Sequence, residues 1–209
     1  MYVPSHFQPP GTAAMHDMIE AYPLAMLVTL KEGFPVVDHI PLLLARQEGT
    51  AGILTGHVAR ANPLWTTHPP AVEVLTVFQG PAAYISPGWY PAKAESGRVV
   101  PTWNYVSVQA KGTIRFITDP DWLLSHLTAL TNQQERALSP PWQVSDAPAD
   151  FIHQMIQSVV GVEIAITDLS GKWKVSQNRP AADIAPLAER LQHNGNDEMA
   201  RIVRQRLER

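Results

Sequence analysis

The sequence predicts a mainly β fold with α-helical additions, in the form of a small β-barrel. Short apolar runs separated by polar turns have the length and residue types of antiparallel strands. Nineteen prolines in 209 residues, about twice the usual share of roughly 5%, limit strand extension and set turns between the runs. After residue 118 the period becomes helical. The strand order stays open, because a barrel and a sandwich share the same two-residue period.

The first elements are a helix and a β-hairpin. We expect a helix over residues 13–22 with Thr12 as its N-cap. Its apolar side chains share one face, namely Met15, Met18, Ile19 and Tyr22. Residues 24–30 and 35–45 are predicted to form two strands joined by a turn at Glu32-Gly33, which makes a hairpin.

The middle of the chain adds three strands. Residues 52–56 form a short strand, after which the run HVARANPLWTTH (57–68) indicates a short helix. Residues 71–78 are the clearest strand, because β-branched and aromatic residues dominate them. A long loop over 87–99 then leads into one long or bent strand, in which Gly112 indicates a bulge or a close backbone approach.

Helices dominate the second half. Asp119 is expected to cap the first of them. The expected elements are a helix over 119–138, a helix over 148–161 that ends at Gly161, a strand over 162–169, and two short helices at 182–192 and 197–209.

Composition excludes several classes of protein. Hydrophobic residues make up 45% and charged residues 17% of the chain, which is incompatible with intrinsic disorder. With no cysteine, the chain has no disulfide scaffold, thiol nucleophile or zinc-finger ligands. The eight histidines show no close ligand spacing, so we expect no metal site. No apolar run is long enough to span a membrane and no secretory signal is visible, so we expect a cytoplasmic protein.

One chemically dense segment runs from Thr55 to Pro63, where a strand is expected to give way to a helix. Free backbone N–H groups and the helix dipole favour an anion at such a junction. His57 and Arg60, three residues apart, add donors and a fixed positive charge. The simpler alternative is an ordinary helix start with a surface arginine.

Two further clusters combine aromatic and polar residues. Residues 85–93 and 100–105 hold four aromatic side chains with Ser86, Lys93 and Asn104, a set able to stack on and hydrogen-bond a flat heteroaromatic ligand. They equally suit a packed, irregular loop. Residues 171–179 are cationic around Trp173, as at a solvated hairpin end or an RNA-binding patch.

Five motifs together resemble the PaiB family of FMN-binding negative transcriptional regulators. They are MYVPSHF (1–7), GHVARANPLW (56–65), GPAAYISPGWYPAK (80–93), VPTWNY (100–105) and GKWKVSQNR (171–179). The resemblance implies an FMN-binding split β-barrel of the flavin-reductase and pyridoxamine-phosphate-oxidase type. It also implies a homodimer that holds FMN where two subunits meet. Residues 1–180 would form this domain with inserted helices, and residues 181–209 a C-terminal helical extension.

The resemblance also places the cofactor-binding residues. FMN needs cations and N–H donors for its phosphate, a flat apolar wall for its ring and polar groups at the pyrimidine edge. The phosphate contacts would be His57, Arg60 and Asn62. The ring would lie against Asp38, His39, Ile40, Pro41, Thr55 and Gly56. Trp89, Lys93, Trp103 and Asn104 are further candidates, from the same subunit or its partner.

Several functions stay open at this stage. The regulatory role comes from the family, and a net charge of −3 predicts weak or indirect DNA binding. Direct binding would rest on residues 172–179 or on Arg201, Arg204 and Arg206, although a packed or dimer-contact helix is the simpler interpretation of the last segment. The alternatives are a flavin-dependent oxidoreductase, a haem protein using His39 or His57, and a dimeric scaffold without a ligand. His39 also suits an ordinary buried histidine.

Overall fold

The computed structural model describes residues 1–47, 51–68 and 71–205. Within them the chain divides into two compact units. Unit 1 comprises residues 1–18, 79–109 and 170–209, and unit 2 comprises residues 19–78 and 110–169. Arg206 of the last predicted helix lies outside the described residues.

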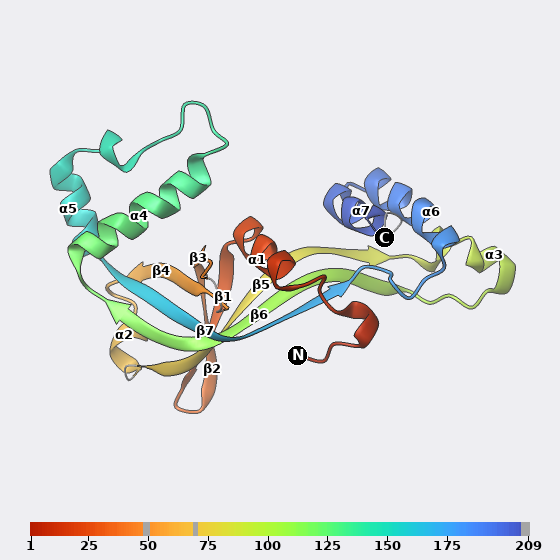
Figure 1. Ribbon diagram of the computed structural model, residues 1–209, viewed down its shortest axis with the longest axis horizontal. Coiled ribbons are helices and arrows are strands. Elements are labelled where there is room, and N and C mark those ends of the chain that lie inside the picture. Colours follow the sequence, from red (N-terminus) through yellow and green to blue (C-terminus); the bar gives the residue numbers. More distant parts are fainter. Residues whose placement is uncertain (48–50, 69–70, 206–209) are drawn as a thin grey trace. The chain divides into compact units, whose positions relative to one another are not determined.

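Seven strands in the described residues form a sheet in the order β2-β1-β5-β6-β7-β4-β3 (Figure 1). The strands are β1 (Leu24–Lys31), β2 (Phe34–Pro41), β3 (Leu43–Ala45), β4 (Ile53–Ala59), β5 (Val72–Ile85), β6 (Thr102–Ile117) and β7 (Val159–Lys174). The helices are η1 (Ser5–Phe7), α1 (Thr12–Ala21), α2 (Leu64–Thr67), η2 (Pro87–Trp89), α3 (Ala92–Ser96), α4 (Pro120–Glu135), η3 (Val144–Asp146), α5 (Ala149–Gln157), α6 (Ala181–His193) and α7 (Asp197–Arg204).

The predicted hairpin is confirmed in unit 2. β1 and β2 pair antiparallel from Leu24 opposite Pro41 to Lys31 opposite Phe34. The two turn residues, Glu32 and Gly33, have φ angles of 51° and 82°. Two positive φ values match the twist of a two-residue hairpin turn, which explains the glycine.

Two glycines let the other strands of unit 2 approach their neighbours closely. A Cβ on Gly112 of β6 would lie 2.4 Å from the carbonyl oxygen of Ala165 in β7. The close backbone approach predicted at Gly112 is therefore confirmed. A Cβ on Gly161 of β7 would lie 2.3 Å from Trp122 of α4, so α4 packs directly on this strand.

Unit 1 contains residues 79–85 of β5, 102–109 of β6 and 170–174 of β7, together with α6 and α7. The two helices pack on each other, as Figure 1 shows within this unit. Their buried side chains form its helical core: Ile184, Leu187, Ala188, Leu191, Met199, Ala200 and Val203.

Several predicted boundaries were wrong, each for a local reason. The expected strand 35–45 is two strands, because the chain leaves the hairpin at Leu42 and β3 pairs with β4 instead. The N–H of Leu42 donates a hydrogen bond to the carbonyl oxygen of Pro23. The helix expected in 57–68 covers only α2, since β4 continues to Ala59. The expected loop 87–99 contains η2 and α3.

The end of the second long helix was also predicted wrongly. α5 ends at Gln157, and Gly161 lies inside β7 rather than at a helix end. β7 runs on to Lys174, so residues 171–174 of the expected polar cluster 171–179 belong to a strand. The predicted cap of α4 is confirmed, because Asp119 Oδ1 accepts a 2.7 Å hydrogen bond from Trp122 N–H.

The β1–β2 hairpin leaves large apolar side chains uncovered in the chain as described. Those more than a third exposed are Leu24, Leu30, Phe34, Val36 and Val37. Val36 and Val37 are neighbours on β2, and successive strand residues point to opposite faces. Both faces of this edge strand are therefore open.

In the described residues, no helix is long and apolar enough to cross a membrane.

Candidate functional site

Two of the segments that the sequence singles out meet in unit 2, at β2 and directly after β4. Asn62 Nδ2 donates a 2.9 Å hydrogen bond to Asp38 Oδ1. Asn62 Oδ1 accepts a 2.8 Å hydrogen bond from the N–H of Leu64, the first residue of α2. Asn62 therefore joins β2 to the start of α2 and satisfies one of the helix's free N–H groups.

A hollow of about 590 Å³ lies beside this pair. It falls in the range of roughly 300–1,000 Å³ typical of small-molecule sites. The lining residues are Thr29, Lys31, Val36, Asp38, Ala59, Ala61, Asn62, Pro63, Leu64, Thr67 and His68. The hollow thus offers a carboxylate, an exposed ammonium and an apolar wall within unit 2.

Thr29 is the most informative residue of this hollow. Its side chain is buried, and its Oγ1 has no hydrogen-bond partner in the part of the chain that the structure describes. A buried polar group without a partner costs about 1–3 kcal/mol. A ligand with a polar edge would supply the missing partner, so the orphaned hydroxyl marks the hollow as a candidate binding site.

The guanidinium of Arg60 has partners within the protein. Its Nε donates to the carbonyl oxygen of Gln157 at 2.5 Å and its Nη2 to that of Val159 at 3.0 Å. Arg60 therefore ties the last turn of α5 to the start of β7, where a cation also complements the helix dipole. A phosphate bound here would compete with these two hydrogen bonds.

His57 lies inside β4 rather than at a helix start, and it contacts α4. Its Nδ1 is 3.2 Å from Nε2 of His126, and the His126 ring stacks on Trp122 at 5.3 Å. The structure therefore does not combine His57 and Arg60 into the pair of donors expected from their spacing. The same contact occupies Nδ1 of His57, one of the two ring nitrogens that a haem iron could take.

Burial makes both of these histidines weak bases. It lowers the pKa of His57, and it lowers the pKa of His126 to about 4, with a smaller contribution from the positive charge of His57. A neutral imidazole already has one N–H donor and one acceptor nitrogen, so the hydrogen bond between the two rings needs no additional proton. The pair is therefore neutral at physiological pH.

The other residues predicted on β2 and β4 have different surroundings. His39 is exposed on β2, whereas Ile40 is buried and Pro41 is half-buried. Thr55 pairs with Leu43 and Glu163 on the neighbouring strands. A Cβ on Gly56 would lie 2.7 Å from the Leu42 side chain, so Gly56 allows close packing of the strand that follows β2.

The four remaining predicted residues belong to unit 1. Trp89 is half-buried in η2, and Lys93 is exposed in α3. Trp103 is exposed on β6, where its ring packs edge-on against Tyr84 at 5.9 Å. Asn104 is buried, and its Nδ2 donates a 2.9 Å hydrogen bond to Ser176 Oγ.

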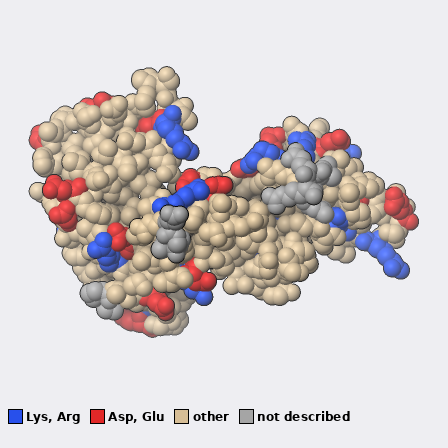
Figure 2. Space-filling model, in the orientation of Figure 1, with Lys and Arg blue, Asp and Glu red and all other residues tan. Residues whose placement is uncertain are grey.

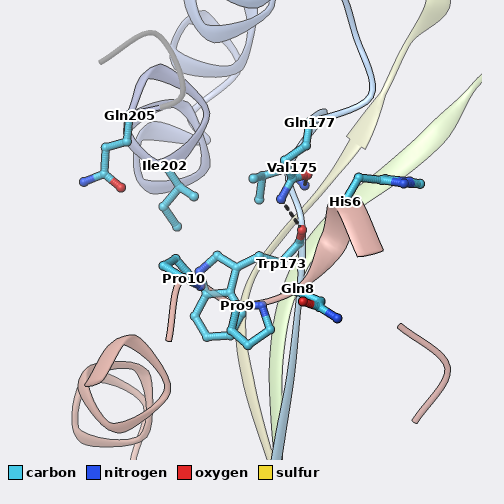
Figure 3. Close-up of a pocket in the computed structure, with 9 residues that line it drawn as sticks. All are labelled: His6, Gln8, Pro9, Pro10, Trp173, Val175, Gln177, Ile202 and Gln205. Atoms are coloured by element: carbon cyan, nitrogen blue, oxygen red, sulfur yellow. Dashed lines mark hydrogen bonds between the residues drawn. The ribbon is translucent and has the colours of Figure 1, made fainter. Parts of the chain in front are cut away.

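Unit 1 has another hollow at the end of β7, of about 470 Å³ (Figure 3). Pro9, Pro10 and Trp173 line it together with Ile202 and Gln205, and Gln177 hydrogen-bonds the carbonyl oxygen of Trp173. Gln205 directly precedes residues 206–209, which are not described, so we assign this hollow no ligand.

Sequence reasoning missed Thr29, Lys31 and His126. Thr29 is the only hydroxyl-bearing residue in an apolar strand, and strand alternation would have placed it on the inward face with Ala25 and Leu27. The alternation of residues 24–30 could therefore have identified Thr29 from the sequence. The contact of His126 with His57 joins residues 69 apart and has no local signature.

Comparison with solved structures defines the fold. The FAD and haem binding protein from Mycobacterium smegmatis matches with a TM-score of 0.57 at 16% identity, covering 80% of this chain and 73% of that one. A conserved hypothetical protein from Mycobacterium tuberculosis matches with a TM-score of 0.58 at 13% identity, covering 86% and 94%. The mainly β split-barrel fold with helical additions is confirmed.

Sequence comparison identifies the family. The family model described as "Putative FMN-binding domain" matches residues 1–168. The Bacillus subtilis "Protease synthase and sporulation protein PAI 2" is 30% identical over 212 residues, covering 100% of this chain and 99% of the relative. An uncharacterized protein of Emericella nidulans is 32% identical over 230 residues, covering 92% of each. The chain belongs to this FMN-binding family, and the resemblance to PaiB is confirmed.

The buried histidine pair predicts a pH dependence of stability. An unfolded histidine has a pKa of about 6.5, so between pH 6.5 and 4 the unfolded chain binds more protons than the folded one. Stability is then complete above pH 7 and falls as the pH drops through this window, by about 2–3 kcal/mol for His126. Urea unfolding followed by circular dichroism between pH 7 and pH 4 measures this.

His126→Phe keeps the ring against Trp122 and removes the titrating group, so it flattens the pH dependence. His153→Gln changes an exposed histidine of α5 and serves as the control. An equal loss of stability on acidification in wild type and His126→Phe would contradict the assignment.

Proposed function

We propose that this chain is a homodimeric flavoprotein that holds FMN in the hollow beside Asp38 and Asn62 and acts in regulation. The observation that carries the proposal is the buried Thr29 hydroxyl, which has no partner among the described residues and lies in a ligand-sized hollow of a chain from an FMN-binding family. The proposed location is cytoplasmic.

The residues around the hollow suit FMN. Asp38 can accept a hydrogen bond from the ring N3–H, while the Thr29 hydroxyl can donate to a ring carbonyl. Val36 offers an apolar wall, and Lys31 is a cation at the end of β1 for the phosphate. Bound FMN would supply a redox centre whose electronics depend on polar groups at the pyrimidine edge.

Arg60 and His57 have a different place in this proposal. Arg60 holds the end of α5 against β7, and the same residue begins the segment that carries Asn62. His57 supports α4 through His126. Both residues would then position the segment around the hollow, while Lys31 supplies the charge that we had expected from Arg60.

The homodimer is supported by the open edge of β2. Phe34 is 77% exposed, and Val36 and Val37 are 39% and 48% exposed. An uncovered apolar edge strand is an unfavourable surface for a single chain in water. A second copy packed on this hairpin would cover these side chains and close the hollow next to Val36.

The regulatory role rests on kinship. The Bacillus relative is named for protease synthesis and sporulation. On the face in Figure 2, apart from the grey residues, Lys and Arg stand scattered among Asp and Glu. We therefore propose that any action on DNA is weak or indirect. A nanomolar, sequence-specific gel shift by the purified protein would overturn that part.

Removing the Thr29 hydroxyl is expected to raise the stability of the flavin-free protein and to weaken flavin binding. Thr29→Val removes the hydroxyl at nearly constant volume. We expect the flavin-free protein to become more stable, by up to about 1 kcal/mol, because an unsatisfied polar group is gone. We expect FMN and riboflavin both to bind several-fold more weakly. Denaturant unfolding and quenching of flavin fluorescence measure the two effects.

Two further variants test the contacts to the flavin ring and to the phosphate separately. Asp38→Asn is expected to weaken FMN and riboflavin alike, while Lys31→Gln weakens FMN only, since riboflavin has no phosphate. Thr66→Val, on the exposed side of α2, is the matched control. Wild-type flavin binding in both Thr29→Val and Asp38→Asn would show that the ring does not lie in this hollow.

The dimer yields a separate prediction. Val37→Asp places a charge on the apolar face of β2 and is expected to convert the dimer to a monomer with at least tenfold weaker FMN binding. Sedimentation velocity and a flavin titration measure both properties. Leu138→Asp, at another exposed apolar site, should leave them unchanged. A wild type that sediments as a monomer with FMN bound would contradict this part.

A further inference from the structure

A further hollow of unit 2 lies between the helices α4 and α5. Its volume is about 550 Å³, within the range of roughly 300–1,000 Å³ typical of small-molecule sites. η3, in the connection that joins the two helices in Figure 1, contributes a third wall. The lining residues are Leu124, Thr128, Asn132, Gln143, Val144, Ser145, Ala147, Ala149, Ile152, His153 and Ile156. None of them lines the hollow beside Asp38 and Asn62.

Both helices present a regular face to this hollow. On α4 the lining residues Leu124, Thr128 and Asn132 are spaced by four, so they lie on one side of the helix. On α5, Ile152 and Ile156 have the same spacing. The residues of α4 that contact β4 and β7 are not among the lining residues. α4 therefore has one face for the sheet and another for the hollow.

The apolar side chains of the lining are only partly covered by the protein. Leu124 is 39% exposed, and Val144 and Ile152 are half-buried. Within α5, all of which the structure describes, Ile156 is the one buried residue. Two facing helices normally bury such side chains against each other. Here a ligand with an apolar body would cover them, which is the main source of affinity in small-molecule sites.

Hydrogen bonds hold the third wall in place. The N–H of Trp142 donates to the Glu135 carboxylate of α4 at 3.0 Å. The N–H of Gln143 donates to Asp146 Oδ2 at 2.9 Å, and the N–H of Asp146 donates to the carbonyl oxygen of Gln143 at 2.9 Å. η3 is therefore closed on itself and attached to the end of α4. A wall held in this way loses little conformational entropy when a ligand binds.

The polar groups of the lining are mostly uncharged. The Thr128 hydroxyl donates to the carbonyl oxygen of Leu124 at 2.8 Å, and Asn132 and Ser145 are exposed at the rim. None of the described lining residues is Asp, Glu, Lys or Arg, and His153 is exposed. An ionised ligand would lose part of its hydration here without gaining a fixed counter-charge. The lining therefore favours an uncharged ligand.

We propose that the hollow between α4 and α5 binds a small uncharged molecule with an apolar body and a hydrogen-bonding end, such as a medium-chain alcohol. Leu124, Ile152 and Ile156 would cover the apolar body, and Asn132 and Ser145 would hydrogen-bond the polar end. A second copy of the chain is the alternative occupant. The concave, three-walled lining suits a small molecule better, because a second copy would have to insert a protruding segment between the helices.

The end of α5 connects this hollow to the segment that carries Asn62. Ile156 lines the hollow, and the next residue, Gln157, accepts the 2.5 Å hydrogen bond from Arg60 Nε. The backbone N–H of Arg60 donates to the carbonyl oxygen of Ser158 at 2.7 Å. A ligand that shifts the end of α5 would therefore change FMN affinity, and FMN would change the ligand's affinity by the same factor. This coupling, unlike the ligand site, rests on the proposed function.

The test of the site is a titration of the flavin-free protein with N-phenyl-1-naphthylamine, an uncharged apolar dye whose fluorescence rises on burial. We expect saturable binding, and displacement by decan-1-ol at a concentration at least tenfold lower than by decanoate. Leu124→Asp places a charge against the apolar wall, and Ala149→Trp fills the hollow from the first residue of α5. Each should weaken dye binding at least tenfold. Both positions are exposed, and circular dichroism checks folding.

The matched control is Leu138→Asp, at an exposed apolar position outside the lining, which should bind the dye as wild type does. Equal dye affinity in wild type, Leu124→Asp and Ala149→Trp would overturn the proposal. Binding that is retained in Leu124→Asp but lost in Val37→Asp would also overturn it, because the dye would then lie at the β2 edge. So would equal displacement by decanoate and decan-1-ol, or a wild type that binds no dye and becomes smaller in sedimentation velocity when Leu124 is replaced.

FMN titrations with and without saturating decan-1-ol test the coupling. We expect a several-fold change in the FMN affinity of wild type, and a smaller change in Arg60→Gln, which lacks the side-chain hydrogen bonds to the end of α5. A protein that binds decan-1-ol but not FMN would support this site and contradict the proposed function. An unchanged FMN affinity in a protein that binds both ligands would overturn the coupling.

Discussion

The candidate site depends on the two hydrogen bonds of Asn62. One bond holds Asp38 of β2, and the other caps the N–H of Leu64 at the start of α2. A short amide side chain can do both because it carries a donor and an acceptor at fixed separation. Without it, α2 would have a free N–H group and the Asp38 carboxylate would lose its partner. The wall of the hollow and its charged acceptor therefore have one common support.

Two features of the chain are costly in isolation and would be relieved by the proposed flavin binding and dimerisation. The Thr29 hydroxyl is buried with no partner in the part of the chain that the structure describes, and the β2 edge exposes valines on both of its faces. Each lowers the stability of a free monomer. A flavin against the first and a second copy against the other would remove both costs. Under the proposed function, this coupling would make cofactor retention depend on assembly, a property suited to a regulator that responds to its flavin.

Sequence reasoning predicted local features well and long-range ones poorly. The hairpin, the Asp119 cap and the close approach at Gly112 follow from turn chemistry, capping and the missing side chain. The family followed from five motifs. The partners of Arg60 and His57 did not, because their contacts lie about 97 and 69 residues away along the chain. Residue type identified donors, and only the tertiary structure showed that these donors already have acceptors.

The most direct measurement of the central claim is the electron density of crystals grown with FMN. The account predicts a flavin ring beside Thr29 and Asp38, covered by the β1–β2 hairpin of a second copy. A ring bound away from these two residues, or bound with no second copy near β2, would contradict it.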